Sequence, residues 1–109
     1  MSTIRSHGLL ALDPGDSRVI QFDWDTEGLP AGVQISTSTF TITTVKQNGA
    51  TILTKDNPSI VAGNRATQVR LIGTTATAGD SYLLMNEIVT SEVPTQTIQR
   101  QIHVLVQDQ

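Results

Sequence analysis

The chain has 109 residues, no cysteine and a net charge of −3, and only 16% of its residues are charged. The absence of cysteine excludes disulfides, thiol catalysis and thiolate metal sites, and the acidic balance argues against nucleic acid as a partner, since phosphates require a basic patch. No apolar run approaches the ~20 residues of a membrane helix, and residues 1–8 lack the apolar core of a signal peptide. We therefore expect one domain covering residues 1–109, made in the cytoplasm without a membrane partner, with residues 1–8 as an extended arm.

The first part of the chain reads as two strands joined by a turn. Leu9–Leu12 is a short apolar run, and residues 13–16 have the sequence Asp-Pro-Gly-Asp, a strong turn signal. The next stretch alternates, so that Ile20, Phe22 and Trp24 share one face. This face is predicted to be buried.

The middle of the chain is rich in Thr and β-branched residues, which favour strands over helices. Residues 33–45 are predicted to form a strand whose side chains Phe40 and Ile42 point inward. Residues 46–49 end in Asn-Gly, the favoured tip of a two-residue hairpin, so residues 51–54 are expected to fold back onto that strand. Residues 55–64, which include a proline and a glycine, are interpreted as a loop.

Three further strands are predicted after this loop. Residues 66–73 alternate, with Thr67, Val69 and Leu71 facing inward, and residues 74–79 form a polar turn. Residues 81–92 are partly apolar on both faces, so this strand is expected to be central or to touch a partner. Residues 97–107 show the clearest alternation. The inward residues of the last two strands are predicted to be Tyr82, Leu84, Ile88, Ile102, Val104 and Val106.

About seven strands separated by turns indicate an all-β fold, an immunoglobulin-like antiparallel β-sandwich. The Cys…Trp…Cys framework of antibody domains is absent. The second face of residues 81–92 carries Leu83, Met85 and Val89, which are the candidate interface residues because exposed contiguous apolar surface usually marks a contact site.

Two polar residues share a face with core residues. Arg100 is in line with Ile98 and Ile102, and Asn86 lies between Leu84 and Ile88. Burying either without a partner is costly. Each either marks the end of the core, with Asn86 bonded to backbone, or forms a polar contact that fixes the register of the last two strands.

No catalytic, cofactor-binding or metal-binding residues are assigned. Of the two histidines, His7 and His103, His103 is interpreted as a surface or interface residue, and no nucleophile motif is present. A cluster of acidic residues could suggest a calcium site, but its spacing does not match an EF-hand loop and a solvated acidic edge is favoured. The cluster consists of Asp13, Asp16, Asp23, Asp25 and Glu27.

Short motifs along nearly the whole chain resemble those of small tailed-bacteriophage proteins described as fiber-tail adaptor or head-tail-associated immunoglobulin-like proteins. These motifs comprise residues 12–14, 20–24, 78–90 and 98–104, together with Phe40. The resemblance implies a virion structural role without cofactor or catalytic residue. It also implies structural positions for Phe22, Trp24, Tyr82, Asn86 and Arg100. Two departures are the long segment 44–65 and Phe40 itself, where tryptophan is more usual.

We therefore expect a non-enzymatic virion subunit, present in multiple copies, that binds other virion proteins as an adaptor between tail or neck and fibres. The partners would be portal, neck, tail, fibre or capsid proteins. One alternative is a capsid decoration protein. Another is a carbohydrate- or cell-surface-binding module, although Phe22, Trp24 and Phe40 all fall on predicted core faces and leave no obvious aromatic platform.

Overall fold

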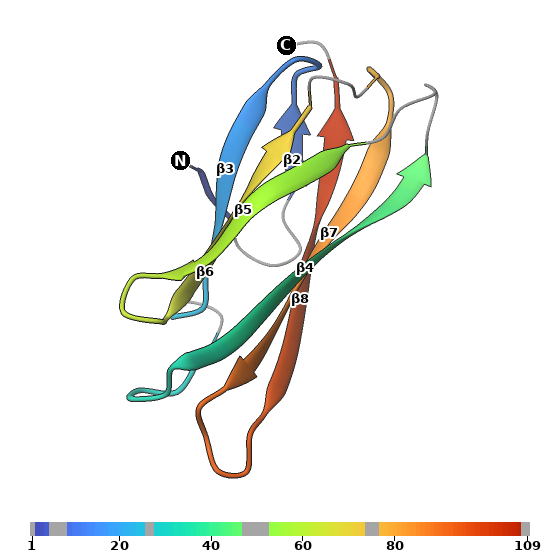
Figure 1. Ribbon diagram of the computed structural model, residues 1–109. Helices are drawn as coiled ribbons and strands as arrows, with labels where there is room; N and C mark the ends of the chain where they lie inside the picture. Colours follow the sequence, from blue (N-terminus) through green and yellow to red (C-terminus); the bar gives the residue numbers. More distant parts are fainter. Residues whose placement is uncertain (1, 5–8, 26–27, 47–52, 74–76, 108–109) are drawn as a thin grey trace.

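Two four-stranded sheets face each other in the computed structural model, which is an elongated sandwich of 45 × 22 × 21 Å (Figure 1). The structure describes residues 2–4, 9–25, 28–46, 53–73 and 77–107. Sheet A consists, in spatial order, of β1 (Ser2–Ile4), β3 (Ser17–Asp23), β6 (Ala66–Ile72) and β5 (Thr54–Val61). Sheet B consists of β2 (Leu9–Leu12), β8 (Thr97–Val106), β7 (Ser81–Thr90) and β4 (Ile35–Lys46). The predicted β-sandwich is confirmed, with eight strands among the described residues.

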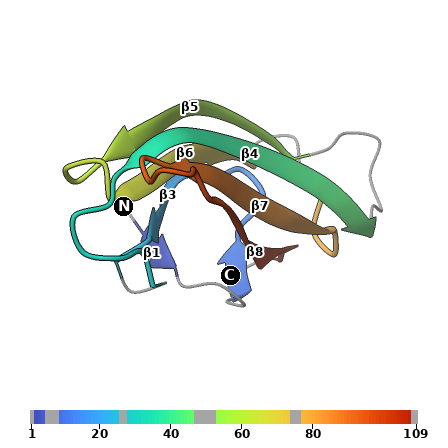
Figure 2. The same cartoon turned by 90° about the horizontal axis from the view of Figure 1, so that it is seen from below.

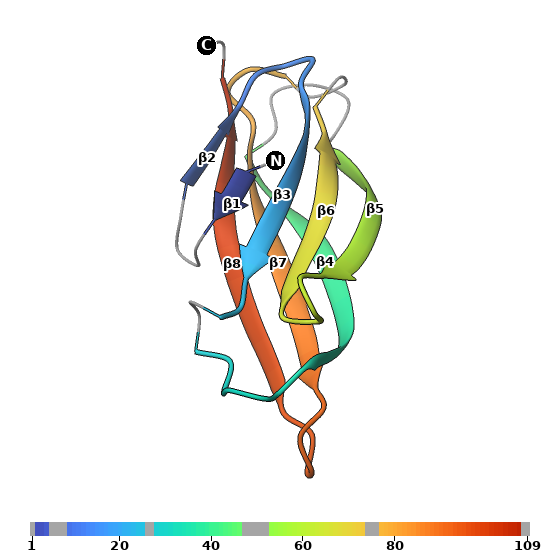
Figure 3. The same ribbon diagram turned by 90° about the vertical axis from the view of Figure 1, so that its left-hand side faces the viewer.

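The strand order corresponds to that of a constant-type immunoglobulin sandwich, in which the strands A-B-E-D form one sheet and C-F-G the other. β1, β3, β6 and β5 take the first four places, and β4, β7 and β8 take the other three. The beginning of the chain contributes to both sheets: β1 pairs with β3 and β2 with β8, and both pairs are parallel (Figure 3). All other strand pairs are antiparallel. Thus part of the expected arm, residues 2–4, is a strand, while residues 1 and 5–8 lie outside the described residues.

The core lies between the sheets and is built by the period-two alternation. Ile42 is only partly buried and packs against the core from the edge strand β4. Phe22 and Phe40 meet across the sheets, edge to face, with ring centroids 6.0 Å apart. The other residues predicted to face inward are buried: Ile20, Phe22, Trp24, Phe40, Val69, Leu71, Tyr82, Leu84, Ile88, Ile102, Val104 and Val106.

The turn between β2 and β3 shows how local sequence fixes the end of the sandwich. Pro14 and Gly15 are its central residues, Gly15 has φ +99°, and the Asp16 N–H donates to the Asp13 carbonyl over 2.9 Å, as in a type II turn. The turn rests on Gly73, whose N–H donates to the Asp16 carbonyl over 2.7 Å. A Cβ at position 73 would lie 2.8 Å from that oxygen, so the close approach requires glycine.

Two sequence predictions for the middle of the chain are wrong. Residues 55–64 are not a loop, because most of them belong to β5, an edge strand that accommodates Pro58 beside a register shift between Asp56 and Ser59. Residue 54 does not fold back onto β4 either: it pairs with Ile72 of β6, because the chain crosses from sheet B to sheet A after β4. The Asn-Gly tip itself, at residues 48 and 49, lies outside the described residues.

Candidate interaction surface

Strand β7 presents the candidate interface residues on the outside of the sandwich. Its side chains alternate without a break, so that Tyr82, Leu84 and Ile88 are buried while Leu83, Met85 and Val89 are half-buried. The half-buried set faces away from sheet A, and its residual burial comes from the flanking strands. β7 is therefore central within sheet B, and its second apolar row lies on the outer face of that sheet.

The outer face of sheet B carries Leu83, Met85 and Val89 of β7, with Glu87 between the last two, and the residues paired with these three on β4 and β8 are uncharged. Leu83 lies between Thr43 of β4 and His103 of β8, and Met85 lies between Thr41 and Gln101. The one carboxylate that the described strands contribute to this face is Glu87, which accepts a hydrogen bond from Gln99 Nε2 over 2.8 Å. Hence most of the face, Thr37 to Thr43 included, is uncharged, a composition suited to protein contact.

Beneath this face, a buried polar cluster joins the two sheets. Asn86 is fully buried, and its Oδ1 accepts from Trp24 Nε1 over 3.0 Å and from the Thr67 hydroxyl. Its Nδ2 donates to Ser38 Oγ over 2.9 Å and to the Thr39 carbonyl over 3.2 Å. One of these four bonds goes to backbone, as the first interpretation expected, and the other three go to side chains. The partners lie on β4, on β6 and at Trp24, which follows β3, rather than on β8. Bonds that span both sheets fix the position of β4 against β7 and of sheet A against sheet B.

Arg100 lies directly opposite Asn86 in the β7–β8 register. Its guanidinium carbon is 5.9 Å from the Trp24 ring centroid, within the range of a cation–π contact, and its Nη1 donates to the Gln99 carbonyl over 2.7 Å. The side chain is half-buried, so it covers the tryptophan while its charge remains near the rim. Arg100 closes this end of the core.

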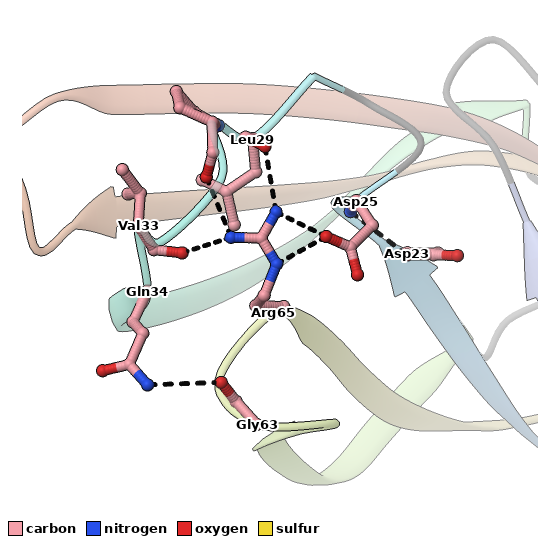
Figure 4. A network of polar contacts seen from close by, with 8 residues as sticks. Asp23, Asp25, Leu29, Val33, Gln34, Gly63 and Arg65 are labelled. Atoms are coloured by element: carbon pink, nitrogen blue, oxygen red, sulfur yellow. Dashed lines mark hydrogen bonds and ion pairs between the residues drawn. The ribbon is translucent and has the colours of Figure 1, made fainter.

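A second polar network holds the loop between β3 and β4 (Figure 4). Arg65, in the turn between β5 and β6, forms an ion pair with Asp25. Its Nη1 also donates to the carbonyls of Pro30 and Val33, and its Nη2 to that of Leu29 over 2.9 Å. Since one guanidinium satisfies three carbonyls of an irregular segment, Arg65 orders this loop in place of regular secondary structure.

At the opposite end of the sandwich, Tyr82 and Asp80 form a buried pair. The Tyr82 hydroxyl donates to Asp80 Oδ2 over 2.9 Å and accepts from the Leu53 N–H over 3.3 Å. Burial raises the pKa of the Tyr82 phenol, and the hydrogen bond to Asp80 raises this pKa further. The pair joins the beginning of β7 to Leu53, the residue that precedes β5.

The acidic cluster of the sequence does not come together in space. Asp13 and Asp16 precede β3 and Asp23 and Asp25 lie at its other end, seven strand residues or roughly 23 Å away. Asp25 is engaged with Arg65, and Glu27 lies outside the described residues. Within the described ranges, no three His, Asp or Glu side chains are grouped as metal ligands would be, and no helix is long and apolar enough to cross a membrane. His103 is exposed on the outer face of sheet B, and His7 is outside the described residues.

Comparisons with protein-family models, with curated proteins and with solved structures gave no match for this chain.

Several residues of these networks were not singled out from the sequence. Ser38 and Thr67 look like ordinary strand residues, and only the inward parity of Thr67 marked it as a candidate for burial. Arg65 lies between two strands, where periodicity carries no information, and its acceptors are mostly backbone carbonyls. Asp80 lies within the 78–90 motif, two residues before Tyr82, and that spacing was the available signal for the pair.

Proposed function

We propose that this chain is a non-enzymatic assembly module, a virion structural protein of a tailed bacteriophage that acts as an adaptor between tail or neck and fibres. The observation that carries the assembly role is the outer face of sheet B, where Leu83, Met85 and Val89 form an apolar row that Glu87 interrupts and that uncharged Thr, Gln and His residues border. The virion setting is supported by the resemblance of the sequence motifs to small phage adaptor proteins. Other virion proteins are the proposed partners on this face.

The polar residues of the buried networks are engaged inside the domain. Trp24, Asn86 and Thr67 bond to one another, and Arg65 bonds to the loop it orders. No buried side-chain nitrogen or oxygen of the described residues lacks a hydrogen-bond partner. These groups support the fold, which leaves the outer surfaces of the sandwich for contact with partners, and the outer face of sheet B is the one that carries the apolar residues of β7.

The test is to place two charges in the apolar row. Met85→Lys with Val89→Lys should leave the domain folded, because both side chains are only half-buried, while incorporation of the chain into particles should fall at least tenfold, since a desolvated interface rejects unpaired charge. Incorporation is measured by mass spectrometry of purified virions, and folding by circular dichroism and thermal unfolding.

The matched control is Gln68→Lys with Ile72→Lys. These residues have the same spacing on β6, the central antiparallel strand of the other sheet, and are also half-buried on an outer face. This variant should be incorporated normally. Normal incorporation of the Met85/Val89 variant, or its failure to fold, would contradict the proposed surface. Coding regions for capsid, portal or tail proteins beside this one are expected, and metabolic genes in their place would contradict the virion role.

A further inference from the structure

The outer edge of β4 is long and regular, and from Thr37 to Thr44 it has no charged residue or proline that would hinder pairing with another strand. β4 pairs with β7 on one side, and no strand of the described residues pairs with its other side. Between its two register shifts, Thr37 to Thr44 run without irregularity, an edge of eight residues or roughly 27 Å. Half of the backbone N–H and C=O groups of such a strand point away from its neighbour and can accept another strand.

The usual obstacles to pairing with an identical strand are missing from this edge. No residue from Ser36 to Val45 is charged and none is proline, and the first charge is Lys46 at the end of the strand. Two apolar side chains, Ile42 and Val45, retain exposure here, and Val45 is 54% exposed. An edge without charged side chains does not repel an identical edge, and pairing with that edge would remove exposed aliphatic groups from water.

A two-fold axis through Thr41 gives the best register for such a pair. In this register Thr41 faces its own copy, Thr39 faces Thr43, and the inward residue Phe40 faces Ile42. An aromatic residue opposite a β-branched residue, and Thr opposite Thr, are both favourable cross-strand pairs. An axis through Phe40 would instead place Ile42 opposite Ser38. With the axis at Thr41, Lys46 of each copy faces Ser36, so the two lysines lie at opposite ends of the pair.

We propose that two copies of this chain associate through antiparallel pairing of their β4 edges, with Thr41 on the two-fold axis, so that the two sheets B form one continuous eight-stranded sheet. A single strand pair is small compared with a standard protein interface, so the dissociation constant is expected in the micromolar range. The outer face of sheet B extends across both copies and doubles in area. The inference goes beyond the proposed function and does not rest on it, since it concerns the purified chain alone.

The experiment measures the mass of the purified chain by sedimentation equilibrium and light scattering. The wild type should reach twice the 11.7 kDa of one chain as its concentration rises. Thr39→Lys with Thr43→Lys places lysines opposite each other twice and should weaken the dimer at least about tenfold. Thr39→Lys with Thr43→Glu instead creates two complementary pairs and should restore it. The restoration is specific to the register centred on Thr41.

The matched control is Gln99→Lys with His103→Lys. These residues occupy the same two cross-strand rows of the same face, but on β8, an interior strand. This variant should dimerise as the wild type does. If it loses the dimer while the β4 variants keep it, the copies meet through the outer face and the β4 inference is overturned.

A second measurement does not depend on affinity. Since the chain has no cysteine, Thr41→Cys introduces a single thiol per chain. Directly opposite residues of an antiparallel pair have Cα atoms about 4.5–5.5 Å apart, within the range of a disulfide. Oxidation should cross-link Thr41→Cys into covalent dimers much faster than Gln101→Cys. Equal rates, or a wild-type chain that stays monomeric at about 100 µM, where a weak interface would already be populated, would overturn the inference.

Discussion

The edge strands β4 and β5 lie at the same side of the sandwich, one in each sheet, and are protected in different ways (Figure 2). β5 carries Lys55, Asp56 and Pro58, and a register shift between Asp56 and Ser59 interrupts its ladder. Charges, proline and bulges are the devices that prevent an edge from pairing with another chain. β4 has none of them along Thr37 to Thr44. One edge is closed to other strands, whereas the other is left open.

The two edges also differ in how they are held. β5 is tied at its surface, where Arg70 of β6 donates to Asp56 through both Nε and Nη2. β4 is tied from the interior, where Asn86 of β7 donates to Ser38 and to the Thr39 carbonyl. A strand anchored from the core needs no charged side chains at the surface to hold it, so its outer edge can remain uncharged.

The largest effect is expected from breaking the interior anchor. Asn86→Leu keeps the approximate volume but leaves the Thr67 and Ser38 hydroxyls without their buried partner, and should lower the free energy of unfolding by about 2–4 kcal/mol. Urea unfolding followed by the fluorescence of Trp24, the single tryptophan, measures the loss. Thr41→Val, an exposed change on the same strand, should alter stability by less than about 0.5 kcal/mol. Equal stability of the Asn86 variant and the wild type would show that β4 is held by other contacts.

A smaller effect is expected from removing the protection of β5. Lys55→Thr with Pro58→Thr should change the stability of the monomer by about 1 kcal/mol or less and should introduce self-association through β5. The measurement is made on the Thr39→Lys/Thr43→Lys variant, so that β4 does not contribute. The new association should remain weaker than that of β4 because the register shift between Asp56 and Ser59 persists. A chain that stays monomeric would show that the register shift alone closes this edge.

The smallest effect is expected from the ion pair between Asp56 of β5 and Arg70 of β6. The hydrogen bond from Arg70 lowers the pKa of the Asp56 carboxyl, and the bond to Asp56 raises the pKa of Arg70. A carboxyl whose pKa is lower in the folded chain contributes stability above its unfolded pKa, and this contribution is lost as pH falls through the folded pKa. The thermal midpoints of the wild type and Asp56→Asn should therefore differ slightly at neutral pH and converge below about pH 4. A difference that does not change with pH would contradict this origin.

Alternation in the sequence was sufficient for much of the fold. It placed Ile20, Phe22 and Trp24 on one buried face and put Leu83 and Met85 on the opposite side of β7 from Tyr82. Burial on one face of a strand imposes a period of two directly on the sequence, and for this reason the pattern is readable without any knowledge of the partner strands.

The pairing of β5 could not be read in the same way. Asn-Gly favours a hairpin locally, but whether the chain folds back or crosses to the other sheet depends on which strands lie nearby in the folded state. β5 itself lacks the apolar alternation of the other strands, because it is an edge with Lys55, Asp56 and Pro58. The charged residues and the proline that prevent this edge from pairing also interrupt the alternation by which a strand is recognised in the sequence.

The polar contacts of the candidate site were only half predictable. The inward parity of Asn86 and Arg100 indicated that both needed partners, but not which ones. Trp24, Thr67 and Ser38 come from three other parts of the chain and reach Asn86 only through the packing of the two sheets. Arg65 lies in a turn, where the side-chain pattern has no period. Most of its acceptors are backbone carbonyls, which every residue has, so the sequence does not mark them.

The parallel pairing of β2 with β8 determines how the domain responds to mechanical force. Leu9 to Leu12 run alongside His103 to Val106 in the same direction, and the Gln107 N–H donates to the Leu12 carbonyl over 3.0 Å. A pull that draws the segment before β2 and the segment after β8 in opposite directions acts along both strands. It therefore loads all the hydrogen bonds of the pair at once, in shear, instead of opening them one after another as a pull across a hairpin would. Pulled in this direction, β2 and β8 therefore resist separation with the whole pair at once.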